Sequence, residues 1–436
     1  MNIKEIADKH EAYMIAMRRY FHENPELSGE ETQTIAAISR ELSKMGVDYV
    51  EIPQGGILAK IVGAQDTGRA VLLRGDVDAL NIAEPDENLM GPRCCKSKNA
   101  GVMHACGHDA HTAMLLGTAK VLQEIREDVK GTVYLCFERG EEFTGNIEYI
   151  LEYIEKENIH LDSAFGLHVQ ADLDSGKVGV PETNVMAGLM EFDVTLVGKG
   201  GHGSRPDKAS NPIDAFHAIY GALQAMRMTR FSPFEPLTYS IGKLQAGAEA
   251  NVIPQELTFG GTMRTFDQYG AGMTFFRELK TIIEDACRRY RCKPIYNVYR
   301  RPTTPVINDP ECAHLAKNAI GSVLGQDVLA ETEPWMGSET FSLYQLLWPG
   351  VFALLGIRNA EKGTGAEHHN PYFDVDESVL PKGAACAAAY AMEFLRSDLN
   401  PTQRSVPGGY ETVRREVRNW AGLGADPEDE GSVYDD

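Results

Sequence analysis

The chain has no long apolar run, and this absence argues against a membrane-spanning helix. No stretch of the 436 residues approaches the roughly 20 consecutive apolar residues that such a helix requires. The first seven residues also lack the apolar core and the small-residue cleavage site of a secretory signal. We therefore expect a cytoplasmic protein that does not bind membranes.

Positive charge is scarce as well. The sequence holds 42 lysines and arginines against 63 aspartates and glutamates, which gives a formal net charge of -21. Nucleic acids and anionic lipids are bound through clustered Lys and Arg side chains, whose contacts release counterions. The charge balance argues against a nucleic-acid partner and leaves a small-molecule substrate as the expectation.

Cysteine is too sparse for a disulfide scaffold. A chain of this length without a secretory signal is expected to keep its thiols reduced. There are eight of them, at positions 94, 95, 106, 136, 287, 292, 312 and 386.

The length predicts two domains, because one hydrophobic core rarely serves so many residues. Helix and strand patterns alternate over residues 1–186 and again over 302–398, which indicates an α/β domain in two parts. Residues 187–301 follow a β-α-β-β-α-β order, with strands near 189–197, 238–244, 255–264 and 294–299 and helices near 211–228 and 273–290; this order is typical of a ferredoxin-like unit. Residues 399–436 contain Pro, Gly and an acidic end, so we expect a mobile tail.

One short stretch concentrates groups that bind metals or carry out catalysis. Residues 102–112 contain His104, Cys106, His108, Asp109 and His111 just where a helical pattern begins. Any one of these residues alone has an ordinary structural explanation, since a reduced cysteine is usually a small buried hydrophobe. The interpretation therefore depends on whether other parts of the chain supply further ligands.

Acids and histidines follow several predicted strands. Asp76 and Asp78 follow the strand 70–73, the run 138–142 with its glutamates follows 132–137, and His168 follows 163–167. His369 comes one loop after the strand 350–356. In open α/β sheets the ligand crevice lies beyond the carboxyl ends of the strands, so these side chains are candidates for one site.

The donor types favour a pair of transition-metal ions. Two divalent cations that share a bridging ligand need about five protein groups and an open position for water. Thiolate, imidazole and carboxylate together suit zinc or a neighbouring transition metal better than calcium or magnesium. One carboxylate must stay off the metals to act as a general base, and the adjacent pair Glu141 and Glu142 allows that division.

These segments occur in the order found in one metallopeptidase family. The chain resembles the amidohydrolase branch of the aminoacylase and carboxypeptidase G-type family, which includes hippurate hydrolase and indole-acetyl-amino-acid hydrolase, from about Tyr20 to Leu395. The matching segments are residues 74–80 (Arg-Gly-Asp-Val-Asp-Ala-Leu), 101–112 (Gly-Val-Met-His-Ala-Cys-Gly-His-Asp-Ala-His-Thr), Glu141–Glu142, 166–169 (Gly-Leu-His-Val), 198–203 (Gly-Lys-Gly-Gly-His-Gly), 251–254 (Asn-Val-Ile-Pro), 337–341 (Gly-Ser-Glu-Thr-Phe) and 369–373 (His-Asn-Pro-Tyr-Phe).

The resemblance implies a fold and a metal centre. The fold is a zinc-peptidase-like catalytic domain, with a mixed central sheet flanked by helices, and an inserted ferredoxin-like lid that mediates dimerisation or higher homo-oligomers. Asp78 would orient the site, and Glu141 would be the general base. The implied ligands of two metals, zinc or manganese first and cobalt or nickel next, are Cys106 as the bridge, Glu142 and His369 on one ion, and His108 and His168 on the other.

The resemblance also implies roles outside the metal centre. His202 would reach into the partner's site and hold the oxyanion of the tetrahedral intermediate. Asn251 and Arg264 match residues that bind the substrate carboxylate or carbonyl, and Gly337 with Ser338 matches a backbone segment near that carboxylate. The implied reaction is hydrolysis of an N-acyl amino acid or dipeptide-like amide by a metal-activated water, whose proton passes to Glu141 and on to the leaving amine.

The chain departs from the family pattern at two places. Relatives commonly have Gln-Pro-Ala before the glutamate pair, whereas this chain has Glu138-Arg139-Gly140. Thr340 stands where relatives have an acid. The first change puts extra charge beside the base, where it can change substrate choice. Cys94, Cys95 and the tail have no counterpart in the family, and we expect incidental roles for them.

Two other functions stay open at this point. Cys106 could be the nucleophile of a cysteine amidase with a histidine as base. That mechanism would leave Glu141, Glu142, His168 and His369 without a role, and metal content discriminates between the two. Alternatively, the chain could be a non-catalytic member of the fold that only binds a ligand.

Overall fold

The computed structural model describes residues 2–142, 145–401 and 406–421. The chain forms two compact units. Unit 1 comprises Met1–Val185, Ile307–Pro334 and Thr340–Ala421, and the described part of unit 2 comprises Met186–Val306 and Trp335–Glu339.

Unit 1 is built on an eight-stranded mixed sheet with the order β1-β2-β4-β3-β5-β16-β6-β15. The four central strands β4, β3, β5 and β16 run parallel. The pairs β1–β2, β2–β4 and β16–β6 are antiparallel, and β15 pairs parallel with β6. The strands are β1 (Asp48–Ile52), β2 (Gly56–Val62), β3 (Gln65–Asp76), β4 (Lys130–Glu138), β5 (Ser163–Asp174), β6 (Val178–Gly179), β15 (Leu329–Ala330) and β16 (Gly350–Arg358); β7 (Asn184–Met186) and β14 (Val306–Ile307) form a separate two-stranded sheet.

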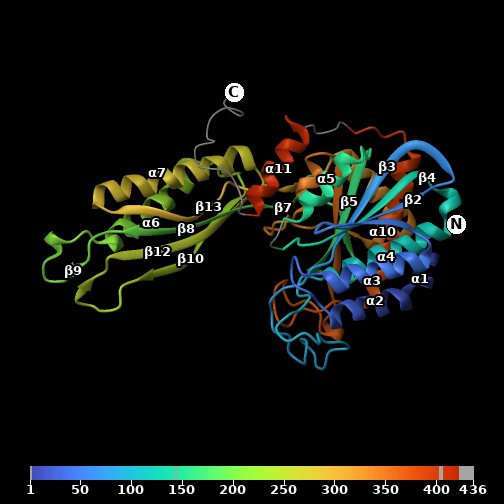
Figure 1. The fold of residues 1–436 in the computed structure, drawn as a ribbon, viewed down its shortest axis with the longest axis horizontal. Helices are drawn as coiled ribbons and strands as arrows, with labels where there is room; N and C mark the ends of the chain where they lie inside the picture. Colours follow the sequence, from blue (N-terminus) through green and yellow to red (C-terminus); the bar gives the residue numbers. More distant parts are fainter. Residues whose placement is uncertain (1, 143–144, 402–405, 422–436) are drawn as a thin grey trace. The chain divides into compact units, whose positions relative to one another are not determined.

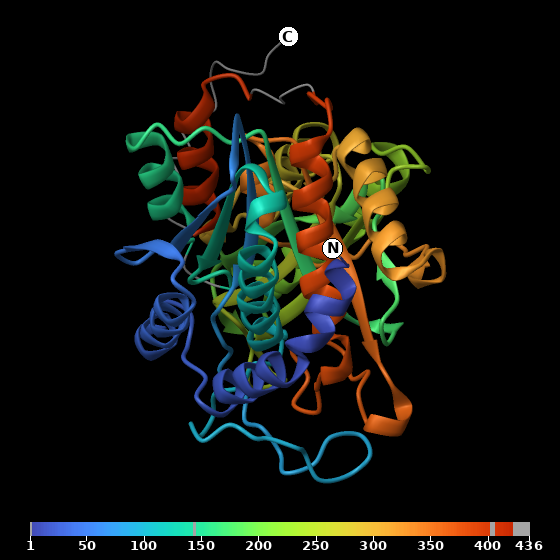
Figure 2. The same cartoon turned by 90° about the vertical axis from the view of Figure 1, so that its right-hand side faces the viewer.

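Helices cover this sheet, and Figure 2 looks onto the layer that contains α4 and α10. Helix α4 packs against α2, α3 and α10, and α10 also packs against α1 and α8. Almost every residue of α4 and α10 is buried, which fits their Ala-rich and Gly-containing sequences. The helices are α1 (Ile3–Lys9), α2 (Glu11–Glu23), α3 (Thr32–Met45), α4 (His108–Glu124), α5 (Ile147–Lys156), α8 (Pro310–Leu324), α9 (Phe341–Gln345), α10 (Leu380–Arg396) and α11 (Gly409–Trp420).

The parallel strands bring polar groups to one edge of the sheet. Asp76, the last residue of β3, pairs in register with Glu138, the last residue of β4. His168 lies in β5, which continues six residues beyond it. The acids and histidine that follow separate strands in sequence thus meet beyond the carboxyl ends of β3 and β4, as open α/β sheets favour.

Unit 2 has the predicted ferredoxin-like order. Its four-stranded antiparallel sheet has the order β10-β12-β8-β13, and α6 and α7 connect β8 to β10 and β12 to β13 (Figure 1). Its elements are β8 (Gly188–Val197), β9 (Gly201–His202), α6 (Pro212–Thr229), β10 (Leu237–Ala246), β11 (Val252–Ile253), β12 (Glu256–Thr265), α7 (Met273–Tyr290) and β13 (Lys293–Tyr299).

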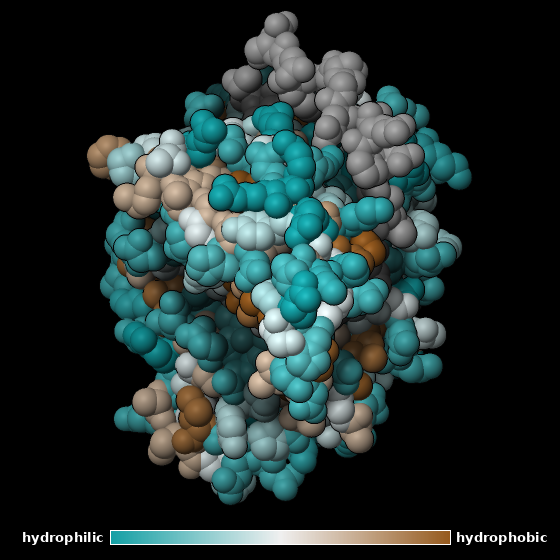
Figure 3. All heavy atoms as spheres, turned by 90° about the vertical axis from the view of Figure 1, so that its left-hand side faces the viewer, coloured by the Kyte–Doolittle hydropathy of each residue, from teal (hydrophilic) through white to brown (hydrophobic). Residues whose placement is uncertain are grey.

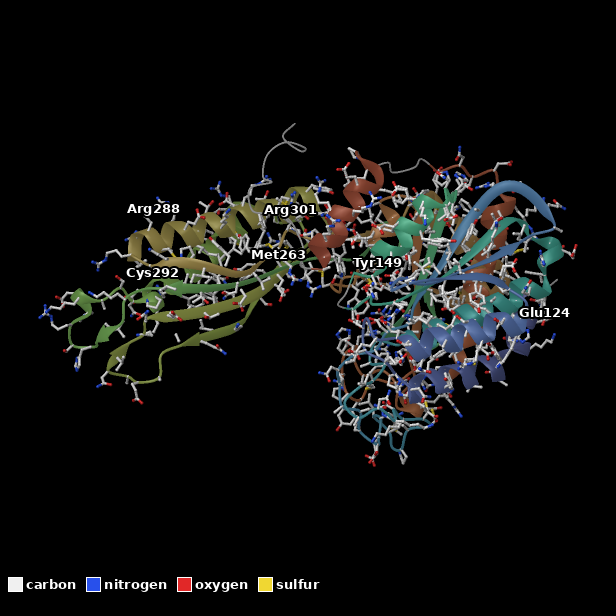
Figure 4. All side chains as sticks on the ribbon, viewed as in Figure 1. Glu124, Tyr149, Met263, Arg288, Cys292 and Arg301 are labelled. Carbon is white, nitrogen blue, oxygen red and sulfur yellow. The ribbon has the colours of Figure 1, made fainter. Side chains whose placement is uncertain are left out.

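The sheet of unit 2 has one apolar face and one polar face. Buried and half-buried residues alternate strictly along β8, so Phe192 and Val194 enclose a core with α6 and α7 on one side only. Met263 of β12 belongs to this core, whereas Arg288 on α7 points away from the sheet (Figure 4). Asp193, on the opposite face, binds Lys243 across the sheet at 2.6 Å.

The boundaries of the insert differ from those expected. Unit 2 extends to Val306 rather than to residue 301, and it also contains Trp335–Glu339, which the sequence pattern places in the second catalytic segment. The reason is local pairing: Ala187 donates its N–H to the Trp335 carbonyl at 3.1 Å. Gly337 and Ser338 are therefore part of unit 2.

The expectation of a mobile tail over 399–436 is wrong for α11. Val413 and Val417 of this helix are buried, and Arg414 pairs with Glu155 of α5. Trp348 meets Tyr410 edge-on, with 6.3 Å between ring centroids. An amphipathic helix thus covers part of unit 1 where the composition had suggested only a tail. The acidic end at 422–436 lies outside the described residues.

One face of the protein can be followed in a space-filling view. The face in Figure 3 is mostly hydrophilic, with apolar side chains in small separate groups. Within the described residues, no helix is long and apolar enough to cross a membrane.

Candidate metal centre and substrate-binding residues

Gly107 shapes the turn that presents Cys106 and His108, the first two predicted ligands. It precedes α4 with φ of 92°, a left-handed conformation that side chains disfavour. A Cβ at this position would also lie only 2.4 Å from Cγ2 of Val169. Glycine is thus required between Cys106, in the loop, and His108, the first residue of α4.

The predicted metal ligands form two groups that share one thiol. The ligand atoms of Cys106, His108 and His168 lie within 4.8 Å of one another, and so do those of Cys106, Glu142 and His369. Cys106 Sγ is 3.6 Å from His168 Nε2, and His369 Nε2 is 3.2 Å from Glu142 Oε1. Ligands of one tetrahedral zinc lie about 3.3 to 3.7 Å apart, given bonds of about 2.0 to 2.3 Å. One pair of ligand atoms in each group is therefore close to the spacing of metal ligands.

Two buried polar atoms at this place support a metal. His108 Nε2 and Glu142 Oε1 are buried, and neither has a hydrogen-bond partner among the described residues. The two atoms are 3.9 Å apart. Burying a polar atom without a partner costs desolvation free energy. A cation bound between these two atoms would remove that cost. The residues present thus fit a pair of thiolate-, imidazole- and carboxylate-bound ions.

Asp78 orients one ligand from each group. Its Oδ1 lies 2.9 Å from His108 Nδ1, and its Oδ2 accepts the backbone N–H of Glu142 at 3.0 Å. A carboxylate behind a metal-binding histidine fixes its tautomer and leaves the other ring nitrogen for the metal. Burial lowers the pKa of His108, but Asp76 and Asp78 outweigh it and raise that pKa to about 10. A metal must therefore displace a proton here.

His168 is oriented by its own strand. Its Nδ1 lies 2.6 Å from the Val169 carbonyl, so Nδ1 carries the proton and Nε2 faces Cys106. Burial, reinforced by the positive charge of neighbouring histidines, lowers the pKa of His168 well below its ordinary value. The ring is thus neutral, as a metal ligand must be.

Asp76 and His111 form a second layer behind the ligands. His111 Nδ1 donates to Asp76 at 2.6 Å, while its Nε2 accepts the Val169 N–H at 3.0 Å. Both ring nitrogens are therefore used within the protein. His104 is also buried, and burial lowers its pKa to about 4. Neither histidine belongs to the two groups that share Cys106.

Adjacent histidines approach the centre from the loop after β16. His369 has φ of 61°, and its N–H donates to the Ala105 carbonyl at 2.9 Å, which holds the loop beside Cys106. His368 Nδ1 lies 3.8 Å from Cys106 Sγ, but its Nε2 accepts the N–H of Ala171 at 3.3 Å. The resemblance over residues 369–373 implies His369 as a ligand and not His368, although residue type alone does not separate the two rings.

Glu141 lies beside the ligands without belonging to either group that shares Cys106. It is buried, with 6% exposure, and its Oε1 accepts the backbone N–H of Thr340 at 3.1 Å. Its carboxylate lies within 4.8 Å of the ligand atoms of His108 and Glu142, and these three residues form a further possible ligand group that lacks Cys106. A carboxylate that is next to the metal ligands and held by a backbone donor is suited to proton transfer.

A buried network next to Glu141 had not been assigned from the sequence. Arg74 donates to Glu138 at 2.8 Å, to Asp76 at 2.7 Å and to the Thr340 hydroxyl at 2.8 Å. The Thr340 hydroxyl donates in turn to Glu138 at 2.8 Å. The two positions that depart from the family pattern therefore contact each other. Their shared departure is the signal that could have revealed the contact.

In unit 2, His202 and Asn251 lie side by side. His202 of β9 pairs with Val252 of β11, and Gly203 donates its N–H to the Asn251 carbonyl at 2.8 Å. His202 and Asn251 are exposed. His202 Nδ1 accepts the Ser204 N–H at 3.1 Å, which leaves the ring proton on Nε2. This histidine thus presents a hydrogen-bond donor to solvent.

Arg264 and Ser338 form a second group in unit 2. Arg264 Nη1 donates to Ser338 Oγ at 3.2 Å, and burial lowers the pKa of the guanidinium. Arg264 pairs with Leu189 at the start of β8, whereas β9 follows the end of that strand (Figure 1). The eight residue steps from Leu189 to Val197 span roughly 26 Å at about 3.3 Å each. His202 and Arg264 of one chain therefore do not share one binding site.

Comparison with known proteins gives a consistent result. The model of "Peptidase family M20/M25/M40" matches residues 72–393. IAA-amino acid hydrolase ILR1-like 4 of Arabidopsis thaliana is 38% identical over 90% of this chain and 89% of its own length. N-acetylcysteine deacetylase of Bacillus subtilis is 35% identical over 88% of this chain and 97% of its own length.

A solved structure agrees with these relatives. The Bacillus subtilis YXEP protein, described as a dinuclear metal binding peptidase from the M20 family, has 30% sequence identity and a TM-score of 0.73. The match covers 89% of this chain and 99% of that one. With the family match, the coverage of its relatives and the paired ligand groups around Cys106, the chain belongs to peptidase family M20/M25/M40 and is a dinuclear metal-dependent hydrolase.

Proposed function

We propose that this protein hydrolyses the amide bond of N-acyl amino acids or dipeptide-like substrates, with Glu141 as general base. One observation carries the proposal: Glu141 lies beside two ligand groups that share Cys106 but belongs to neither of them. The names of two relatives support the substrate class, since an IAA-amino acid hydrolase and an N-acetylcysteine deacetylase both act on N-acyl amino acids.

The ligand set supports zinc or manganese, with cobalt and nickel as alternatives. Cys106 would bridge the ions, His108 and His168 would complete one site, and Glu142 and His369 the other. When bound, such ions polarise a carbonyl group and lower the pKa of a water molecule towards neutrality.

Glu141 would move the proton. Its carboxylate accepts a proton from the attacking water and then donates it to the nitrogen of the leaving amine, so one group serves as base and acid in turn. The backbone N–H of Thr340, 3.1 Å from Oε1, keeps the carboxylate at a fixed position during both transfers. Asp78 would hold the neighbouring ligands in place through His108 and the Glu142 backbone.

Unit 2 would supply the groups that bind substrate. The Nε2–H of His202 is suited to stabilise an oxyanion, and preorganised donors of this kind often make the largest contribution to catalysis. Arg264, with Gly337 and Ser338, would bind the substrate carboxylate, and Asn251 lies beside His202. Because His202 and Arg264 are at opposite ends of β8, we propose a homodimer or higher homo-oligomer in which unit 2 delivers His202 to the partner's site.

The cellular location is part of the proposal. None of the eight cysteines, all of which are described, is in a disulfide. A reducing compartment such as the cytoplasm suits a centre that depends on the thiolate of Cys106.

A cysteine amidase is the second candidate, because Cys106 Sγ lies 3.6 Å from His168 Nε2. In that mechanism His168 would activate the thiol. It gives no role to Glu141, Glu142 or His369, whose side chains surround the same thiol or lie next to it. Full activity in a preparation freed of metal by a chelator would favour the thiol and overturn the metal mechanism.

Glu141→Gln tests the proposal. A panel of N-acetyl, N-benzoyl and indole-acetyl amino acids and of dipeptides is screened against zinc- and manganese-loaded protein. Wild type is expected to hydrolyse at least one of them, and Glu141→Gln to lower kcat by about 10² to 10⁴ while both metals remain bound. Glu157→Gln, the same change at an exposed position, is the control. Unchanged hydrolysis by Glu141→Gln overturns the role of the base, and a wholly inactive panel overturns the substrate class.

A further inference from the structure

Glu138 is a buried carboxylate that the proposed mechanism does not use. It ends β4 with no exposed surface, so it does not reach substrate directly. Its oxygens accept from Arg74 at 2.8 Å, from the Thr340 hydroxyl at 2.8 Å and from the Tyr344 hydroxyl at 3.0 Å. A buried charge with this many good partners is held in one position.

Thr340 links this network to Glu141. Its hydroxyl lies between Arg74 Nη2 and Glu138 Oε1, accepting from the first and donating to the second, each at 2.8 Å. Its backbone N–H donates to Glu141 Oε1 at 3.1 Å. The side chain of Thr340 is thus held by Arg74 and Glu138, while its backbone N–H binds Glu141.

The direction of the hydrogen bonds depends on the charge of Glu138. Burial raises the pKa of Tyr344 well above its ordinary value, so its phenol stays protonated and donates. Arg74 and Tyr344 both donate hydrogen bonds to Glu138. The side chain at position 138 must therefore offer several acceptor lone pairs, as a carboxylate does. A glutamine at position 138 would offer only one acceptor oxygen and would turn a donor towards the Thr340 hydroxyl.

We propose that Glu138 and Thr340 are positioning residues for the general base. Together with Arg74 they fix the Thr340 peptide, and this peptide fixes the carboxylate of Glu141 for proton transfer. The inference rests on the proposed role of Glu141. It also explains why the departure at 138 comes with one at 340. This chain has a carboxylate at position 138 and a threonine at 340, whereas relatives commonly have a glutamine at the first position and an acid at the second, so in both cases one of the two positions places a carboxylate next to Arg74.

Kinetics of three variants test the proposal. Glu138→Gln and Thr340→Val are expected to lower kcat by about 10- to 100-fold with little change in KM, because base geometry is disturbed and the substrate-binding groups are not. The double variant Glu138→Gln/Thr340→Asp places a carboxylate at position 340, where the Thr340 hydroxyl lies 2.8 Å from Arg74 Nη2, and should recover most of the lost kcat. Glu157→Gln is the matched control and should keep wild-type kcat.

Hydrogen exchange of the metal-free protein gives a readout that does not depend on turnover. The peptide spanning residues 338–345 should exchange faster in Glu138→Gln than in wild type, and the double variant should restore its protection. Unchanged exchange and unchanged kcat in folded Glu138→Gln would overturn the positioning role. Faster exchange with unchanged kcat would also overturn it, since the network would then be structural only. A wild-type protein inactive on every amide refutes the proposed function instead, and the exchange result still decides whether the network fixes Thr340.

Discussion

One pair of candidate functional groups in unit 1 and another in unit 2 are held in opposite ways. In unit 1 the side chains of His108 and Asp78 are almost fully buried and hydrogen-bonded to each other. In unit 2 His202 and Asn251 are exposed, on a two-stranded ribbon outside the main sheet. The side chains of this pair in unit 1 are therefore fixed before any substrate binds, whereas His202 and Asn251 in unit 2 remain accessible to solvent.

The difference follows from what each set of groups must do. A metal centre requires fixed ligands, and burial with a supporting layer of hydrogen bonds provides them at the cost of desolvating charges. A group that contacts substrate and then releases it must remain accessible, so the fold leaves it on the surface. Loss of a group in unit 1 should thus affect metal content and stability, and loss of His202 should affect only the rate.

The largest expected effect comes from Cys106→Ser. Cys106 belongs to both ligand groups, and the substitution replaces its thiolate by a neutral hydroxyl. The affinity for both ions should therefore fall, and kcat should decrease by a factor of about 10³ or more. Elemental analysis of the purified protein gives the metal content, and amide hydrolysis gives the rate. Cys94→Ser, at an exposed thiol, is the control. Retention of two ions at full activity would contradict the shared ligand.

His202→Ala should reduce kcat by about 10² to 10³ and leave metal content and thermal stability unchanged, because the ring is exposed. Mixing this variant with inactive Glu141→Gln tests delivery to the partner. In a symmetric dimer, random exchange of subunits should restore about a quarter of wild-type activity, since half the dimers are mixed and each has one complete site. A mixture that stays inactive after subunit exchange would show that His202 acts within its own chain or not at all.

Asp109→Asn is expected to have the smallest effect on the rate of hydrolysis. It should nevertheless lower the free energy of unfolding clearly. Asp109 is buried beside His108 and pairs with Arg18 at 2.9 Å and His22 at 2.8 Å. Burial raises its pKa, but the two cations outweigh burial and the pKa is lowered overall. The carboxylate therefore stabilises the fold above its unfolded pKa of about 3.9, and this contribution is lost as the pH falls from there towards the folded pKa.

Asp109→Asn should lower the free energy of unfolding at pH 7 by about 1.5 to 3 kcal/mol. Arg18 and His22 lose the buried carboxylate that they share, although Arg18 keeps Asp374 and Glu377 and His22 keeps Glu84. The substitution should also flatten the loss of stability below pH 4, as measured by denaturant unfolding across pH. Asp207→Asn, at an exposed pair with Arg205 in unit 2, is the control and should leave both quantities unchanged. Equal effects of the two variants would contradict the contrast between the units.

Much of the fold was predictable because its elements have clear periodicity. The strict alternation along β8 and the apolar runs of β4 and β16 mark strands directly. What was missed has weaker or ambiguous patterns. The strand β1 has only one buried residue, and α11 lies within a stretch whose composition is that of a tail.

The sequence could predict which residues form the candidate site, but not which of their atoms contact each other. The positions of Asp76, Glu142 and His168 after predicted strands indicated a common edge, since parallel strands bring their carboxyl ends together. In the structure β3 does end at Asp76, whereas His168 lies within β5. Sequence spacing could not show that Thr340 touches Glu138, because the contact joins segments separated by all of unit 2. Nor could it show which nitrogen of His108 faces Asp78, which depends on a rotamer fixed by packing.

The position of His369 in the chain also sets an order of assembly. Cys106, His108 and His168 all precede unit 2, whereas His369 follows it and is tied to Ala105 by its N–H. During synthesis the first ligand group is therefore complete long before the second. A growing chain would have the three predicted ligands of one ion before unit 2 is made, and would acquire His369, a predicted ligand of the other ion, only after unit 2.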